Sequence, residues 1–140
     1  MSAIDTLGSA WAPRMLSILR IVVGFLYIWH GTSKIFGFPS AGGAPFVPLD
    51  WMTLKGVSAI LELVGGVLLL IGLFSRPVAL ILSGHMAFAY FMAHAPQSVW
   101  PIINRGELAI VFCFVFLYIA AAGPGPWSVD AAMRRGRSSP

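Results

Sequence analysis

Residues 62–74 read ELVGGVLLLIGLF, and this stretch places one carboxylate in a segment with no other ionisable side chain between Gly56 and Phe74. An ionised side chain at the centre of a bilayer costs roughly 2.5 to 3.5 kcal/mol on insertion scales, so it usually faces protein or water and has a partner. Glu62 therefore indicates a buried polar site. The other apolar segments supply its candidate neighbours, which are His30, Lys34, His85, Arg105 and Glu107.

The composition favours a membrane protein over a soluble one. The chain has 140 residues, which is room for one domain, 1–140. Hydrophobic residues make up 58% and charged residues 10% of it, whereas soluble domains carry about 25% charged residues. The net charge is +4, but the basic residues mostly flank apolar runs and so set membrane topology. We expect the lipid bilayer as a partner and no nucleic acid.

Four apolar segments separate along the chain, at about 13–36, 56–74, 77–94 and 106–122. A helix needs about 17 to 25 residues to cross a bilayer, and continuous apolar runs favour helices over barrel strands. The sequence therefore predicts an all-α polytopic membrane protein, an antiparallel bundle of four transmembrane helices. A basic tail at 128–140 follows, in which Ser128 can N-cap a short helical turn.

Lys and Arg residues indicate the orientation of this bundle. With a cytoplasmic N-terminus, the inner side holds six of them and the outer side three: Arg14, Arg20, Arg76, Arg134, Arg135 and Arg137 inside, and Lys34, Lys55 and Arg105 outside. This positive-inside bias places the N- and C-termini in the cytoplasm.

Helix rise and helical angle bring the intramembrane polar residues together. His30 and Glu62 both lie about 9 Å below the outer ends of their helices, and His85 about 13 Å below. His30 and Lys34 are an i,i+4 pair, and Arg20, Tyr27 and Gly31 fall near the same stripe of the first helix. We therefore expect these groups to gather in the outer, periplasmic half of the bundle.

Structural alternatives remain open for several of these residues. Arg20 can snorkel to the inner headgroups and Lys34 to the outer ones. His85 can be a hydrogen-bonded core histidine, and Glu62 can form a purely structural ion pair with Lys34. The one cysteine, Cys113, has no partner for an intrachain disulfide, and no metal site is expected.

The ordered set of motifs from about Leu19 to Asp130 resembles the DoxX family of small four-helix membrane proteins. The motifs are LRIVVGFLYIWHGTSKIFG (19–37), ELVGGVLLLIGLFSR (62–76), AYFMAH (89–94), NRGELA (104–109) and GPGPWSVDA (123–131). The resemblance implies a bacterial inner-membrane protein linked to quinone-dependent oxidation, or one that partners soluble redox and sulfur-transfer enzymes. The family's polar positions correspond to Arg20, His30, Lys34, Glu62, Asn104 and Glu107, and His85 is not among them.

Our leading hypothesis is a membrane component of a quinone-linked redox system, and hence a subunit of a quinone-dependent oxidoreductase. A quinone needs an apolar slot and donors for its carbonyl oxygens. In this interpretation His30 and Lys34 donate, and Glu62 orients His30 or relays protons. Those three residues form the candidate catalytic set. The candidate cofactor-binding set is Arg20, Gly31, His85, Asn104 and Glu107.

Three alternatives stay open. The chain can be a non-catalytic scaffold that holds soluble redox enzymes through its cytoplasmic tail. It can be a small-molecule or ion transporter, since intramembrane ionisable residues also mark such pathways. A haem ligated by His30 and His85 is the least favoured alternative. The sequence also leaves open a homo-oligomer.

Overall fold

The computed structural model describes residues 2–40 and 47–137, except for the side chains of residues 3 and 4. Regular structure in these ranges is helical throughout. The helices are α1 (Ala3–Phe36), α2 (Leu54–Ile71), α3 (Ser75–Ala89), the π-helix η1 (Tyr90–His94), α4 (Pro101–Asn104), α5 (Glu107–Ala122) and α6 (Val129–Arg137). The prediction of an all-α fold is confirmed. Residues 138–140 of the expected tail and residues 41–46, between the first two predicted segments, lie outside the described ranges.

Three helices of the described part are long and apolar enough to cross a membrane: Asp5–Phe36, Leu54–Ile71 and Ser75–His94. The helix Glu107–Ala122 is equally apolar but shorter. The helices differ from the predicted segments mainly at their ends. α1 begins upstream of Pro13, which lies inside the helix, and α2 ends at Gly72, a left-handed C-cap with φ 74°.

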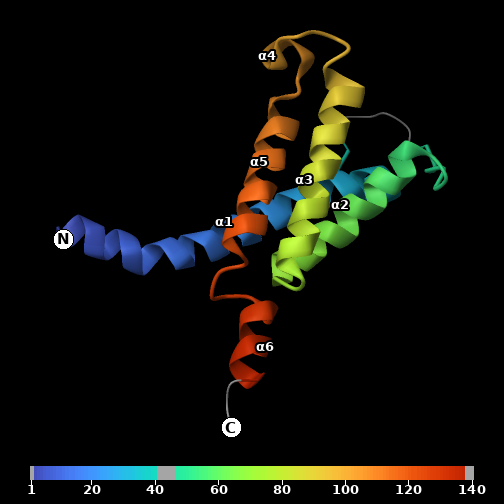
Figure 1. Cartoon of the computed structure of the whole chain (residues 1–140). Coiled ribbons are helices and arrows are strands. Elements are labelled where there is room, and N and C mark those ends of the chain that lie inside the picture. The colour runs from blue at the N-terminus through green and yellow to red at the C-terminus, as the bar shows by residue number, and fades with distance from the viewer. Residues whose placement is uncertain (1, 41–46, 138–140) are drawn as a thin grey trace.

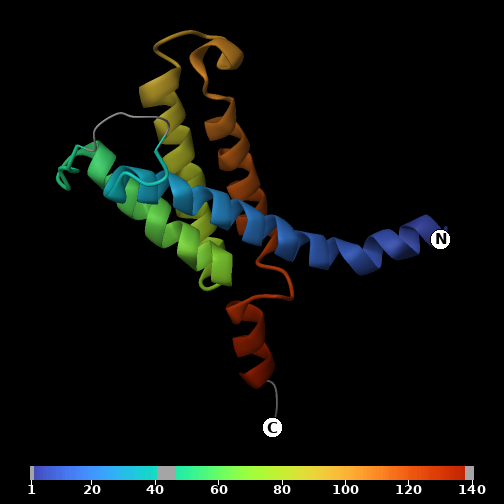
Figure 2. The same cartoon turned by 180° about the vertical axis from the view of Figure 1, so that it is seen from behind.

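The long helices pack in two pairs, α1 with α2 and α3 with α5. Figures 1 and 2 show the two pairs diverging towards the end of the molecule that carries α4, while α6 lies beyond the opposite end of α5. The N-terminal part of α1 projects away from the other helices in both views. The buried core between the pairs contains Tyr27, Leu69, Leu82, Phe116 and Ile119.

Glycines set the close contact between α1 and α2. A Cβ on Gly31 would lie 2.6 Å from the backbone nitrogen of Leu63, and one on Gly24 would lie 2.8 Å from that of Leu70. Small residues allow helix backbones to approach in this way inside membranes. The approach holds the C-terminal half of α1 against α2, and the polar site forms beside this contact.

At the α6 end of the molecule, two arginines cap helix C-termini. The Arg20 side chain is fully buried and donates to the carbonyl oxygens of Leu69 at 2.5 Å and Leu70 at 2.8 Å, at the end of α2. It also donates to the Pro124 oxygen at 2.9 Å and to the Trp127 oxygen. Arg76 donates to the carbonyls of the last turn of α5. Cations at helix C-termini satisfy orphan carbonyls and complement the helix dipole.

Asp130 of α6 caps the start of α3 in the complementary way. Its Oδ1 accepts from the Phe74 N–H at 2.9 Å and its Oδ2 from the Ser75 N–H at 2.8 Å. Phe74 has a positive φ of 50° and no cap from its own side chain. The carboxylate therefore fastens α6 to the α2–α3 turn, while Ser128 caps α6 itself through the Ala131 N–H.

Candidate functional site: a polar cavity between the helix pairs

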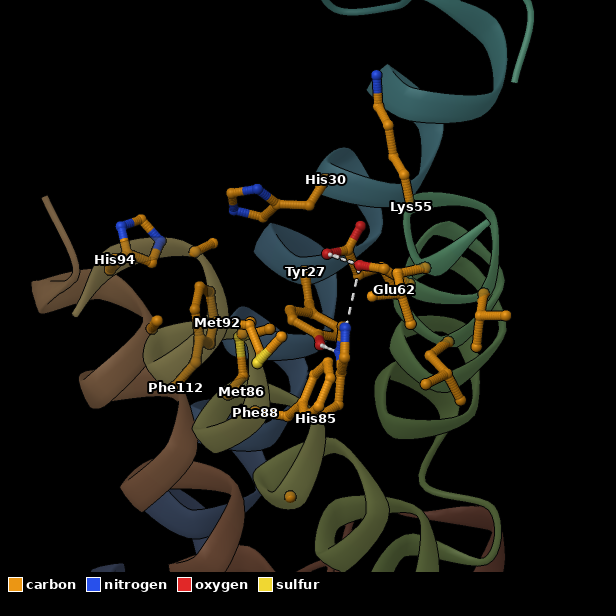
Figure 3. Close-up of a pocket in the computed structure, with 18 of the residues that line it drawn as sticks. Tyr27, His30, Lys55, Glu62, His85, Met86, Phe88, Met92, His94 and Phe112 are labelled. Carbon is orange, nitrogen blue, oxygen red and sulfur yellow. Dashed lines mark hydrogen bonds between the residues drawn. The ribbon is translucent and has the colours of Figure 1, made fainter. Parts of the chain in front are cut away.

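A cavity of about 860 Å³ lies between the two helix pairs, in the half of the molecule that carries η1 and α4. Its walls come from α1, α2, α3, η1 and α5. Apolar side chains such as Met86, Phe88 and Phe112 line most of it. All three histidines of the sequence, His30, His85 and His94, line it as well (Figure 3). The cavity is thus an apolar chamber with a few polar groups, which is the usual form of a small-molecule site.

Glu62 is the buried acid of this cavity, and among the described residues only one of its two carboxylate oxygens has hydrogen-bond partners. Its Oε1 accepts from Lys34 Nζ at 2.5 Å and lies 3.1 Å from Ser58 Oγ. Lys34 also donates to Ser58 Oγ at 3.0 Å. The residue is 3% exposed, and within the described part of the chain its Oε2 is buried and has no hydrogen-bond partner. An unsatisfied carboxylate oxygen in a dry site is costly, so this atom is a candidate contact for a ligand.

Ser58 links this ion pair to His85 and Tyr27. His85 Nε2 lies 3.0 Å from Ser58 Oγ, and the other ring nitrogen, Nδ1, lies 2.7 Å from the Tyr27 hydroxyl (Figure 3). Tyr27 is 1% exposed, and its ring packs edge-on against Phe116 at 4.9 Å between centroids. The result is one continuous hydrogen-bonded chain that joins α1, α2 and α3.

His30 and His94 stand higher in the cavity in the view of Figure 3, above Tyr27 and His85. The exposed His30 ring packs edge-on against Phe112, with 6.0 Å between ring centroids. Among the described residues His30 has no hydrogen-bond partner. His94 lies in the π-helix η1, stacks on Tyr90, and contacts the Asn104 carbonyl oxygen through Nδ1 at 2.9 Å. π-Helical turns occur frequently at functional sites.

The structure brings half of the predicted site residues together. His30, Lys34, Glu62 and His85 all line the cavity. Arg20, Gly31, Asn104 and Glu107, expected in the cofactor-binding set, do not line it.

Each of these four residues lies outside the cavity and has a structural role there. Arg20 caps α2 at the opposite end of the molecule, and neither reaches headgroups nor contacts Glu62. Gly31 is a contact point between α1 and α2. Asn104 is 2% exposed and holds the loop before α5 through Ser98 and Gly106. Glu107 is exposed in the first turn of α5, where a carboxylate favours the helix dipole.

Ser58, Tyr27 and His94 contribute polar groups to the cavity and were not predicted as site residues. Ser58 is one helical turn before Glu62, and this i,i+4 spacing was the available signal. Tyr27 was noticed only as part of the polar stripe of α1. His94 was treated as the end of an apolar segment, because nothing in the sequence indicates that η1 turns it into the cavity.

No set of three His, Cys, Asp or Glu side chains in the described part of the chain could hold a metal ion. Ligation of a haem by His85 would break hydrogen bonds, because both ring nitrogens already contact protein groups. His85 could therefore bind a haem iron only by giving up one of these two hydrogen bonds.

These features define a class of protein: a helical, multi-pass membrane protein with a hydrogen-bonded acid inside its bundle. The sequence model of the DoxX family matches residues 15–95. The chain belongs to the DoxX family, which confirms the resemblance.

The curated relatives agree with a membrane location. An uncharacterized protein of Haemophilus influenzae is 42% identical over 124 residues, covering 86% of this chain and 91% of that protein. Two proteins of Escherichia coli are also similar: inner membrane protein YphA is 26% identical over 84% of this chain and 89% of its own length, and inner membrane protein YqjF 29% identical over 84% and 91%. No solved structure matches the chain. The chain is a multi-pass inner-membrane protein, as predicted.

Proposed function

We propose that the cavity binds a quinone or a similarly small amphipathic molecule, and that the protein is a membrane component of a quinone-linked redox system. The observation that carries the proposal is the combination of an apolar chamber of about 860 Å³ with a buried carboxylate that keeps one oxygen unpartnered among the described residues. A ring with an alkyl tail fits the apolar walls, and its oxygens need only a few directed polar groups.

Donors for such a ligand are available at the polar wall. An ammonium group has three N–H donors, and Lys34 uses two of them, towards Glu62 and Ser58. The third remains for a ligand oxygen. His30 lines the same cavity, and its ring nitrogens form no hydrogen bond with a described residue. These two side chains support the role proposed for them as donors to quinone carbonyl oxygens.

The electron donor would be another protein. The sequence has one cysteine and no CxxC pair, so it offers no dithiol for electron transfer. We propose a soluble redox enzyme as the partner, which would bring the oxidoreductase activity.

We also propose that α5 is the fourth membrane span and that both termini face the cytoplasm. Its apolar sequence and its packing along α3 support a span, although it has only 16 residues. The arginines of α6 support the orientation, because Lys and Arg collect on the cytoplasmic side. With this orientation the cavity opens towards the periplasmic half of the bilayer.

A thermal-shift experiment tests the ligand. Decylubiquinone should raise the unfolding midpoint of the detergent-solubilised protein. His30→Leu removes a cavity donor that forms no hydrogen bond with a described residue and keeps an apolar side chain there, so this variant should fold normally and respond less. Glu62→Ala should lose the response altogether. Glu107→Gln, an exposed carboxylate outside the cavity, is the matched control and should respond like the wild type. Equal shifts in all four proteins would contradict a ligand in this cavity.

A further inference from the structure

The hydrogen-bond partners of Ser58 determine where the protons lie in the hydrogen-bonded series around it. Ser58 Oγ contacts Lys34 Nζ at 3.0 Å, Glu62 Oε1 at 3.1 Å and His85 Nε2 at 3.0 Å. An ammonium group only donates and a carboxylate only accepts. The single hydroxyl proton of Ser58 therefore points to Glu62, and Ser58 accepts from both Lys34 and His85.

This assignment fixes the tautomer of His85. Its Nε2 must carry the proton that Ser58 accepts. In a neutral imidazole the other nitrogen is then an acceptor, so Nδ1 accepts the Tyr27 hydroxyl proton at 2.7 Å. Every proton in the series from Tyr27 through His85 and Ser58 consequently points in one direction, towards Glu62.

Glu62 is suited to be the end of this series. Its Oε1 has two partners, but its buried Oε2 has none in the described ranges. Oε1 is within hydrogen-bond distance of the Ser58 hydroxyl, so it is the acceptor for the last proton of the series, and Lys34 holds this oxygen in place.

Tyr27 is suited to be the beginning. It lines the cavity beside His30 and Phe112, and its hydroxyl oxygen keeps acceptor capacity while its proton is directed at His85. A ligand hydroxyl that reaches this oxygen would complete the chain.

We propose that Tyr27, His85, Ser58 and Glu62 form a one-directional proton relay that takes a proton from a hydroxyl-bearing ligand. The ligand O–H bond breaks and its proton moves to Tyr27 Oη. The Tyr27 proton moves to His85 Nδ1, the Nε2 proton to Ser58 Oγ, and the Ser58 proton to Glu62 Oε1. One proton is transferred in total, no electrons move, and the ligand is left as an oxyanion near Lys34 and His30.

The inference rests on the proposed function and narrows the ligand class. The favoured ligand is the reduced, hydroxyl-bearing form of a quinone-like ring, because only that form brings a proton. Tyr27 would contact the ligand directly, whereas Ser58 and His85 would act on the ligand only through Tyr27.

Infrared difference spectroscopy tests the relay on the full-length protein in detergent. Decylhydroquinone, added without oxygen, should produce the band of a newly protonated carboxyl group, and Glu62→Gln should remove that band, which assigns it to Glu62. The dimethyl ether of decylhydroquinone has the same ring and tail but no hydroxyl proton, and it should produce no band.

Two variants of Ser58 separate a relay from a structural role. Ser58→Ala removes the hydroxyl that connects His85 to Glu62 and should lose the band. Ser58→Thr keeps a hydroxyl at the same position and should retain it. Unfolding midpoints of both variants check that they are folded. Should Ser58→Ala not fold, His85→Phe takes its place, because it breaks the same series one step earlier and should also lose the band.

The possible outcomes are distinct. Binding of both compounds, seen as equal thermal shifts without a carboxyl band, leaves the proposed ligand site standing and overturns the relay. A band that persists in Ser58→Ala also overturns it. Binding of neither compound overturns the relay and the proposed function together.

Discussion

Glu62 and Lys34 illustrate how one ion pair determines the geometry of the site. The pair joins α1 to α2 with an Nζ to Oε1 distance of 2.5 Å, and Lys34 is partly exposed at 29% while Glu62 is 4% exposed at its side chain. Glu62 is therefore the member whose charge depends on the ion pair for stabilisation, because water cannot reach it. Removal of one member of a buried pair usually destabilises a protein more than removal of both.

Lys34→Met should destabilise the protein by about 3 kcal/mol, because it leaves a buried carboxylate without its cation. The double variant Lys34→Met with Glu62→Gln should recover part of that loss. Chemical unfolding in detergent, followed by circular dichroism, measures both. A double variant less stable than Lys34→Met would contradict the argument.

Arg20 is the second residue whose environment decides its role. Four carbonyl oxygens from two segments converge on one buried guanidinium group. Arg20→Met should therefore lower the stability by at least about 3 kcal/mol, since hydrogen bonds to a charged group contribute about 1.5 to 3 kcal/mol each. Arg20→Lys should recover only part, because an ammonium group lacks the planar fork. Denaturant midpoints provide the comparison, and equal stability of Arg20→Met and wild type would refute it.

At this scale, sequence reasoning found the groups but not all of their partners. Glu62 required a partner, and Lys34 was among its candidates because it is an ionisable residue of the first apolar segment, one helical turn from His30. Ser58 was missed because serine is ordinary in membrane helices. The role of Arg20 could not be predicted, because the carbonyls it binds come from the end of α2 and from the 124–127 segment, whose positions depend on the whole fold.

Among the elements, α6 is held to the α2–α3 turn by a titratable group, the Asp130 carboxylate. Burial by itself would raise the pKa of the Asp130 carboxyl, but hydrogen bonds from Ser75 and Phe74 and the nearby Arg134 outweigh it, so the pKa lies below the usual 3.8. A carboxyl with a lowered pKa in the folded state stabilises that state above its unfolded pKa. The stabilisation disappears as the pH falls through the lowered folded-state pKa.

Asp130→Asn should accordingly be less stable than the wild type at neutral pH and equally stable in strong acid. The physical reason is that protonation of Asp130 removes the same charge that the substitution removes. Unfolding midpoints of both proteins across an acid titration measure the difference, and other titrating groups cancel in the comparison. A difference that is constant across the pH range would contradict this account of the cap.

The close packing of α1 against α2 depends on the absence of a side chain at Gly31. An added Cβ would lie 2.6 Å from a backbone nitrogen of α2, which cannot rotate away. Gly31→Ala should cost about 1 to 3 kcal/mol, the usual range for overpacking. Gly8→Ala is the matched control, since a Cβ there meets nothing within 4 Å. Thermal unfolding of the two variants tests the contact, and a Gly31→Ala protein as stable as Gly8→Ala would argue against it.

Element positions were largely predictable from the run lengths of apolar residues, and their ends were not. The apolar run near 56–74 extends past Gly72, yet the helix stops at Ile71, where Gly72 turns the chain. Pro13 suggested a helix start, but α1 continues through it to Ala3. The π-helical turn at η1 has no sequence signature in this chain, although it determines the position of His94.

For the whole molecule, the orientation across the bilayer remains a prediction that labelling can test. In a Cys113→Ala background, Val47→Cys places a thiol in the exposed loop after α1, and Gly136→Cys places one in α6. A membrane-impermeant maleimide should label the first in intact cells and the second only after permeabilisation, because Lys and Arg residues favour α6 in the cytoplasm. The reverse pattern would contradict the proposed topology.

The unequal lengths of α1 and α5 have a consequence for the surrounding lipid. α1 has 34 residues and α5 has 16, which correspond to about 51 Å and about 24 Å of helix, against a hydrocarbon thickness of about 30 Å. The long helix must tilt or emerge from the acyl region, whereas α5, as the fourth span proposed above, would require the lipid beside it to thin. With α5 as a span, the protein would deform its annulus unevenly, and acyl chains would be more compressed on the α5 side than on the α1 side.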